Sequence, residues 1–90
     1  MRVIHKYPLE VRDKQQIELP KDSEILTIQT QKGIPCLWAL VQTENSKEVR
    51  TIHTFGTGNE INIDTDNLTY ISTYQLHSGS FIFHTFLENR

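Results

Sequence analysis

Residues 70–87, which read YISTYQLHSGSFIFHTFL, decide the fold class. β-Branched and aromatic side chains dominate both ends of this stretch, as they do in strands. Between them, the residues 77–80 (His-Ser-Gly-Ser) are typical of a tight turn. We therefore predict an antiparallel hairpin with strands at residues 70–76 and 81–87.

The alternation of apolar and polar residues continues upstream of this hairpin. Further strands are expected at residues 3–7, 16–19, 25–30, 36–41 and 49–55. No segment has the sustained apolar spacing of a helix; residues 9–13 are too short for more than a turn, and residues 22–23 or 61–67 could hold a short helical turn. The sequence predicts one all-β domain over residues 1–90. We expect about seven short antiparallel strands in a small sandwich or open barrel, with at most one short helical turn.

Composition and charge limit the partners of this chain. The 90 residues carry a formal net charge of -2 at pH 7, which argues against binding to duplex nucleic acid. No apolar run approaches the roughly 20 residues that span a bilayer, and the first six residues lack the apolar core of a signal peptide. The single cysteine, Cys36, cannot form an internal disulfide and fits a reducing compartment. We expect a cytoplasmic protein without a membrane partner.

Two predicted strands are apolar on both faces, namely residues 36–41 and residues 81–87. A chain of 90 residues has little material with which to cover both faces of a sheet. We therefore expect a homo-oligomer that associates through a sheet face or edge. The alternative is that the remaining strands wrap around and cover both faces.

The sequence offers little catalytic chemistry. Cys36 lies in an apolar run, where an inert buried thiol is the simpler interpretation, and no nucleophile-elbow pattern surrounds any serine. Asp64 and Asp66 fit a solvated loop as well as a cation site. His53 and His84 fit a ligand pocket or simple packing, and the four histidines lack the spacing of a structural zinc site. We predict no enzymatic activity, no metal and no cofactor.

The best candidate for a ligand contact is the glycine-rich turn after the strand at 49–55. It matches neither a P-loop nor a dinucleotide fingerprint, but its backbone N–H groups can form a concavity for an anion. A guanidinium upstream could pair with a phosphate, and aromatic rings could stack on a base. The alternatives are that the glycines only shape a bend and that the tryptophan belongs to the core. The candidate ligand-binding residues are Arg50, Gly56, Thr57, Gly58, Trp38, Tyr7 and His84.

Several segments together resemble a family of small proteins encoded by bacteriophages and prophages. They are Lys6-Tyr7-Pro8-Leu9-Glu10, Ile17-Glu18-Leu19-Pro20, Pro35-Cys36-Leu37-Trp38-Ala39-Leu40-Val41, Phe55-Gly56-Thr57-Gly58, Tyr74-Gln75-Leu76 and Phe81-Ile82-Phe83-His84. The resemblance covers almost the whole chain and offers no site motif to map. Small phage proteins of this kind include sponges that sequester cyclic nucleotide or cyclic ADP-ribose-like signals of the CBASS and Thoeris immune systems.

The resemblance implies a non-enzymatic anti-defence sponge that binds a small nucleotide-like ligand in the host cytoplasm. A sponge needs no nucleophile or metal, and it needs a pocket that subunits can share. The alternative is a protein-interaction module that inhibits a host protein or accompanies phage structural proteins. An enzyme such as a nucleotide phosphodiesterase is the third interpretation.

Overall fold

The computed structural model describes residues 1–90 as seven strands and one short 3₁₀ turn. The strands are β1 (Arg2–Pro8), β2 (Lys14–Pro20), β3 (Glu24–Gln31), β4 (Ile34–Gln42), β5 (Lys47–Gly56), β6 (Leu68–Leu76) and β7 (Phe81–Glu88), and the 3₁₀ turn is η1 (Thr65–Asn67). All paired strands run antiparallel. The all-β prediction with about seven strands and one helical turn is confirmed.

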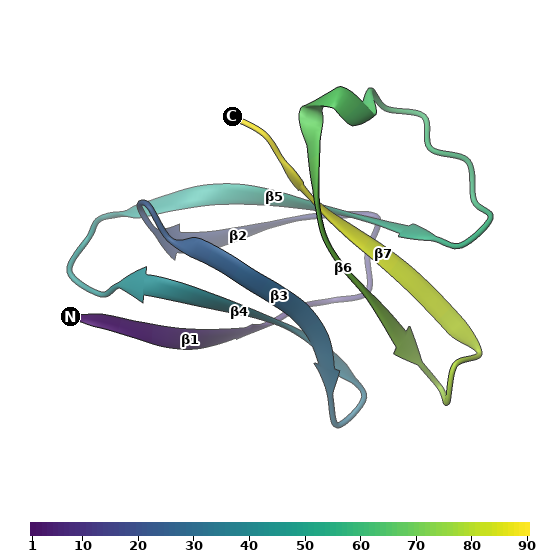
Figure 1. The fold of residues 1–90 in the computed structure, drawn as a ribbon, viewed down its shortest axis with the longest axis horizontal. Coiled ribbons are helices and arrows are strands. Elements are labelled where there is room, and N and C mark those ends of the chain that lie inside the picture. Colours follow the sequence, from purple (N-terminus) through teal and green to yellow (C-terminus); the bar gives the residue numbers. More distant parts are fainter.

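The strands form two sheets that pack as a sandwich (Figure 1). The three-stranded sheet has the order β1-β4-β3, and the four-stranded sheet has the order β2-β5-β7-β6. The Cα atoms extend over 40 and 32 Å in two directions but only 15 Å in the third. This thickness suits two sheets stacked about 10 Å apart.

The apolar run of β4 supplies the centre of the core. Leu37, Ala39 and Val41 are buried between the sheets, because β4 is the middle strand of its sheet. Successive side chains point to opposite faces, so Trp38 and Leu40 lie on the outer face, where they are half-buried. The core cluster is completed by Leu9, Ile28, Ile52 and Tyr74. The run is therefore fully covered on its inner side and only partly on its outer side.

The edge strands β3 and β6 join the two sheets along one side (Figure 1). Each strand has a register shift at this point, between Ile25 and Thr27 in β3 and between Tyr70 and Ser72 in β6. The buried Ser72 hydroxyl donates to the Ile28 carbonyl at 2.5 Å and accepts from the Ile28 N–H at 3.2 Å. The Ser72 hydroxyl thus satisfies the backbone N–H and carbonyl of Ile28, as a neighbouring strand would otherwise do. We call this contact the β3–β6 seam.

The C-terminal end of β5 has no partner strand on the β2 side. β2 begins at Lys14, which pairs with His53, so the last residues of β5 extend beyond β2. The long connection formed by residues 57–67 loops out from this end and returns through η1 to β6 (Figure 1, upper right). This loop and the β6–β7 hairpin frame the open end of the sandwich, where the cavities of the chain lie.

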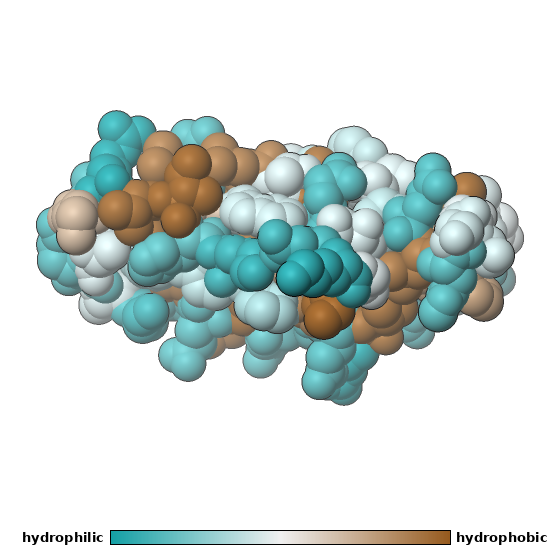
Figure 2. Space-filling model, turned by 90° about the horizontal axis from the view of Figure 1, so that it is seen from below, coloured by the Kyte–Doolittle hydropathy of each residue, from teal (hydrophilic) through white to brown (hydrophobic).

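Several large apolar side chains lie on the surface. Met1, Ile4, Val49, Tyr70 and Phe81 are each more than half exposed. In Figure 2, hydrophobic residues gather near the end of the molecule that holds the N-terminus, and others lie toward the opposite end. None of the helical structure has the length and apolar character needed to cross a membrane.

Candidate ligand-binding site

The glycine-rich segment forms a tight turn that ends β5. The Asn59 N–H donates to the Gly56 carbonyl at 3.1 Å, and Gly58 has a φ of +86°. A four-residue turn with positive φ at its third position favours glycine there. The Thr57 N–H donates to the carbonyl of Ile82 at 3.1 Å, which fixes the turn against β7. The predicted turn is therefore present, and β7 holds it in place.

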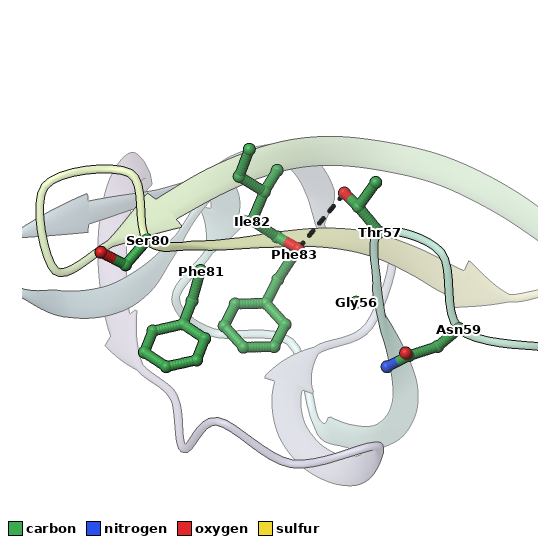
Figure 3. A pocket seen from close by; sticks show the side chains of 7 residues that line it. All are labelled: Gly56, Thr57, Asn59, Ser80, Phe81, Ile82 and Phe83. Atoms are coloured by element: carbon green, nitrogen blue, oxygen red, sulfur yellow. Dashed lines mark hydrogen bonds between the residues drawn. The ribbon is translucent and has the colours of Figure 1, made fainter.

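A cavity of about 290 Å³ opens between this turn and the β6–β7 hairpin (Figure 3). Its lining residues are Gly56, Thr57, Asn59, Ser80, Phe81, Ile82 and Phe83. The rings of Phe81 and Phe83 lie on the same side of β7, with centroids 6.5 Å apart and planes 16° apart. Phe81 is 53% exposed. The cavity, called here the phenyl cavity, therefore offers a flat aromatic surface to solvent.

The side chain of Asn59 forms one wall of the phenyl cavity. It extends from the turn toward the two phenyl rings (Figure 3). A Cβ atom on Gly56 would lie 2.8 Å from Asn59 Nδ2, so the carboxamide packs directly over this glycine. The carboxamide makes no hydrogen bond within the chain, and no charged side chain lines the cavity. A free donor and a free acceptor thus stand beside an aromatic surface.

His84 links the turn to β6 through a chain of hydrogen bonds. Its Nε2 lies 2.7 Å from Thr57 Oγ1, and its Nδ1 lies 2.9 Å from Thr73 Oγ1, which in turn contacts the Tyr70 hydroxyl at 2.7 Å. Both ring nitrogens therefore face neutral hydroxyl groups. A catalytic triad would instead place a carboxylate on one of these nitrogens to stabilise an imidazolium. The arrangement holds the turn in position.

Arg50 lies inside the sandwich, away from the turn. Its side chain is on the same face of β5 as buried Ile52, and the residue is only 8% exposed. Burial and the nearby Arg90 lower the pKa of the guanidinium, and Glu48, whose carboxylate is 4.0 Å away, opposes this change. Gly56 lies six residues further along the strand, a distance of about 20 Å. The structure does not bring Arg50 and the glycine turn together within one chain.

Trp38 and Tyr7 also lie apart from the turn, because both belong to the three-stranded sheet. Trp38 is half-buried on the outer face of that sheet. Tyr7 packs against the core, its hydroxyl has no hydrogen-bond partner, and burial raises its pKa. The aromatic rings beside the turn are instead those of Phe81 and Phe83, which are not among the candidate residues predicted from the sequence. The sequence could have indicated Phe81, since this aromatic residue directly follows a predicted turn.

The comparison with protein families covers the whole chain, because one family model matches residues 1–90. The chain belongs to the DUF7352 family, a domain of unknown function. No curated protein and no solved structure matches the DUF7352 chain.

Two groups considered for chemistry have structural roles in this DUF7352 chain. Asp64 begins η1, where its Oδ1 accepts a hydrogen bond from the Asp66 N–H at 2.9 Å. Cys36 is 3% exposed, as expected for an inert buried thiol. By contrast, His53 has a charged partner, since its Nε2 lies 2.8 Å from Glu88 Oε1. Of the candidate residues, only Gly56, Thr57, Gly58 and His84 come together.

Proposed function

We propose that this protein binds and sequesters a small nucleotide-like molecule without transforming it. In this proposal the base of the ligand lies on the exposed ring of Phe81, inside the phenyl cavity. One observation carries the proposal: a free carboxamide, that of Asn59, stands beside two nearly parallel phenyl rings. Flat rings that also present hydrogen-bonding groups along their edge are the chemistry that such a pair recognises.

The energetics of base recognition support this choice of ligand. Stacking a base on an aromatic side chain contributes about 1–3 kcal/mol. A carboxamide has both donors and acceptors, so the Asn59 side chain can pair with the edge of a base. The cavity lining is uncharged, which suits a neutral base and leaves the phosphate groups of a ligand toward solvent.

The resemblance to phage proteins supplies the biological setting of the proposal. In the cytoplasm of a host, the ligand would be an immune signal of the cyclic oligonucleotide or cyclic ADP-ribose type. Binding without turnover is sufficient for a sponge, and the imidazole of His84 lacks the carboxylate partner of a triad. The protein would act as an anti-defence factor by lowering the free concentration of the signal.

Retention of an intact ligand tests the proposal. The protein is incubated with cyclic dinucleotides, cyclic trinucleotides and cyclic ADP-ribose isomers, separated from free ligand, and then heat-denatured. We expect intact ligand in the released fraction. Degraded ligand would indicate an enzyme, and failure to retain any of these molecules would contradict the proposal.

A variant of the phenyl cavity locates the binding site. Phe81→Ala removes an exposed ring, so we expect weaker retention with a dissociation constant raised roughly tenfold or more, and little loss of stability. Val49→Ala is the matched control, because Val49 is 55% exposed on β5 and lies outside the cavity. Equal retention by Phe81→Ala and the control would exclude the phenyl cavity as the site.

A protein-interaction module is the second candidate function. The observation in its favour is an apolar pair on the outer face of the three-stranded sheet, where Ile4 is 58% exposed beside half-buried Leu40. Such a face could bind a host protein or a phage structural protein. A pull-down from host lysate that yields one partner in stoichiometric amount, with no nucleotide retained, would favour this function.

A further inference from the structure

A second cavity adjoins the phenyl cavity around the end of β5. Its volume is about 370 Å³, and Gly56 and Asn59 line both cavities. The remaining walls come from the start of β2, from β5 and from the loop after Gly58. A single molecule placed beside Asn59 can therefore extend from one cavity into the other.

His53 is a nearly buried polar residue that lines this second cavity. The residue is only 6% exposed, and its Nε2 lies 2.8 Å from Glu88 Oε1. The hydrogen bond to His53 and the nearby charge of Lys14 lower the pKa of Glu88, so this carboxylate is ionised at neutral pH and accepts the Nε2 proton. In the neutral ring Nδ1 then carries a lone pair, and it makes no hydrogen bond within the chain.

Glu88 engages one of the two ring nitrogens of His53 and leaves the other without a partner. Glu88 borders a third cavity and does not line the second one, whereas His53 and Ile63 line both. His53 lines both cavities, and its Nε2 is engaged by Glu88. The free acceptor Nδ1 is therefore the part of His53 available to a group in the second cavity.

The other side chains of the second cavity favour donor groups. Asp13 and Glu60 contribute two carboxylates against the single ammonium of Lys14. Such a lining accepts hydrogen bonds from hydroxyl groups and disfavours phosphate. Phe55 adds a flat apolar wall, since its ring lies nearly parallel to that of His53, at 6°. An apolar ring edged with hydroxyl groups, such as a pentose, matches these features.

We propose that the second cavity takes the sugar of the same ligand, with Nδ1 of His53 accepting a hydrogen bond from a pentose hydroxyl. This inference rests on the proposed function, because it assigns the sugar of a ligand whose base lies on Phe81. A nucleoside joins a base and a pentose by one bond, and the shared residues Gly56 and Asn59 allow it to reach both cavities.

The experiment uses the full chain with ¹⁵N-labelled histidine and four ribonucleosides as probes, each paired with its 2′,3′-dideoxy form. Two-bond ¹H–¹⁵N spectra report on Nδ1 of His53, and ring proton signals report on Phe81. We expect at least one ribonucleoside to shift both groups of signals. Its dideoxy form should shift those of Phe81 alone and bind about three- to tenfold more weakly.

A variant gives a second measurement of the same contact. His53→Phe keeps a ring and removes the acceptor, so it should bind the ribonucleoside and its dideoxy form equally. His5→Phe is the matched control, because His5 is exposed on β1 and lines none of the cavities. If His53→Phe does not fold, the dideoxy comparison on the unmodified chain decides.

The possible outcomes separate the two proposals. Shifts at Phe81 without a change at His53, together with equal affinity for both nucleoside forms, would overturn the sugar assignment and leave the base site standing. The absence of any shift with all four ribonucleosides, and of any retained cyclic nucleotide, would overturn both.

Discussion

Gly56 and Gly58 stand one residue apart and are glycines for different reasons. Gly58 adopts a left-handed backbone with φ +86°, and a Cβ there would meet no atom within 4 Å. Gly56 has no such φ, but its Cβ would press on the carboxamide of Asn59. The sequence could predict the turn. It could not show that Gly58 is required by its backbone conformation and Gly56 by the space that Asn59 occupies.

Substitution at Gly58 tests the conformational requirement. Gly58→Val should lower the free energy of unfolding by about 1–2 kcal/mol, because a β-branched residue is strained in the left-handed region. Gly58→Asn is the control, since asparagine tolerates this region and should change stability much less. Denaturant titration measures both. A wild-type midpoint for the valine variant would show that the turn accepts another geometry.

Glu88 should give the protein a measurable acid sensitivity. The hydrogen bond from His53, and the charges of His53 and Lys14, lower its pKa in the folded state. Folding therefore favours the carboxylate. This contribution is fully present above the ordinary glutamate pKa of 4.5 and is lost as the pH falls through the lowered value.

The melting temperature between pH 6 and pH 3 tests this effect. We expect it to fall less steeply in Glu88→Gln than in the wild-type protein, because the amide keeps an acceptor for His53 and does not titrate. Glu44 has a lowered pKa through the N-terminal ammonium and acts in the same pH range. Glu44→Gln should therefore remove a separate part of the slope. Parallel curves for wild type and Glu88→Gln would rule out the role of Glu88.

Arg50 shows where prediction of the site from sequence failed. Its distance along the chain from Gly56 is short, but an extended strand turns six residues into about 20 Å. Residues of both faces of β5 include apolar and polar side chains, so the sequence did not show which face packs against the other sheet. The burial of Arg50 could therefore not be predicted. Thr57 and His84, both among the candidate residues, lie together because β5 and β7 pair next to each other.

At the level of elements, the strands were predictable and their arrangement was not. Alternating side chains and turn residues located all seven strands and the β6–β7 hairpin. The order of strands in each sheet depends on contacts far apart in sequence, such as the pairing of β1 with β4. The seam between β3 and β6 was equally hidden, because it depends on one hydroxyl group and two register shifts.

Removal of that hydroxyl tests the importance of the seam. Ser72→Ala leaves the N–H and carbonyl of Ile28 without the partner they now share, so we expect a loss of about 1–3 kcal/mol in unfolding free energy. Ser46→Ala, at an exposed serine whose side chain makes no hydrogen bond, should change little. Thermal unfolding compares the two. If the two variants have the same melting temperature, water replaces the Ser72 hydroxyl and the seam adds no stability.

For the molecule as a whole, the small core leaves one sheet face only partly covered. The outer face of the three-stranded sheet carries half-buried Trp38 and Leu40 together with exposed Ile4. The four-stranded sheet is partly covered on its outer side, where the loop of residues 57–67 lies over His53. The predicted association of subunits therefore has one clear candidate surface, the outer face of the three-stranded sheet.

Sedimentation velocity tests this association. We expect a species at least double the 10.5 kDa mass of the chain at micromolar concentration. Ile4→Glu should convert it to monomer by placing a carboxylate beside Leu40 and Trp38. Val49→Glu is the control, because Val49 is equally exposed on the other sheet. A wild-type protein that sediments only as a monomer would refute the oligomer.

The β3–β6 seam also determines how the sandwich fluctuates. The two sheets are tied to each other along β3 and β6, whereas β1 and β2 are free edges on the opposite side. Partial opening should therefore separate β2 from β4 first, because the sheets also contact each other there, away from the seam. Amide hydrogen exchange would record this asymmetry: the Ile28 amide should exchange among the slowest in the chain, and amides along β1 much faster. The two sheets would then separate transiently at the side opposite the seam and stay together along β3 and β6.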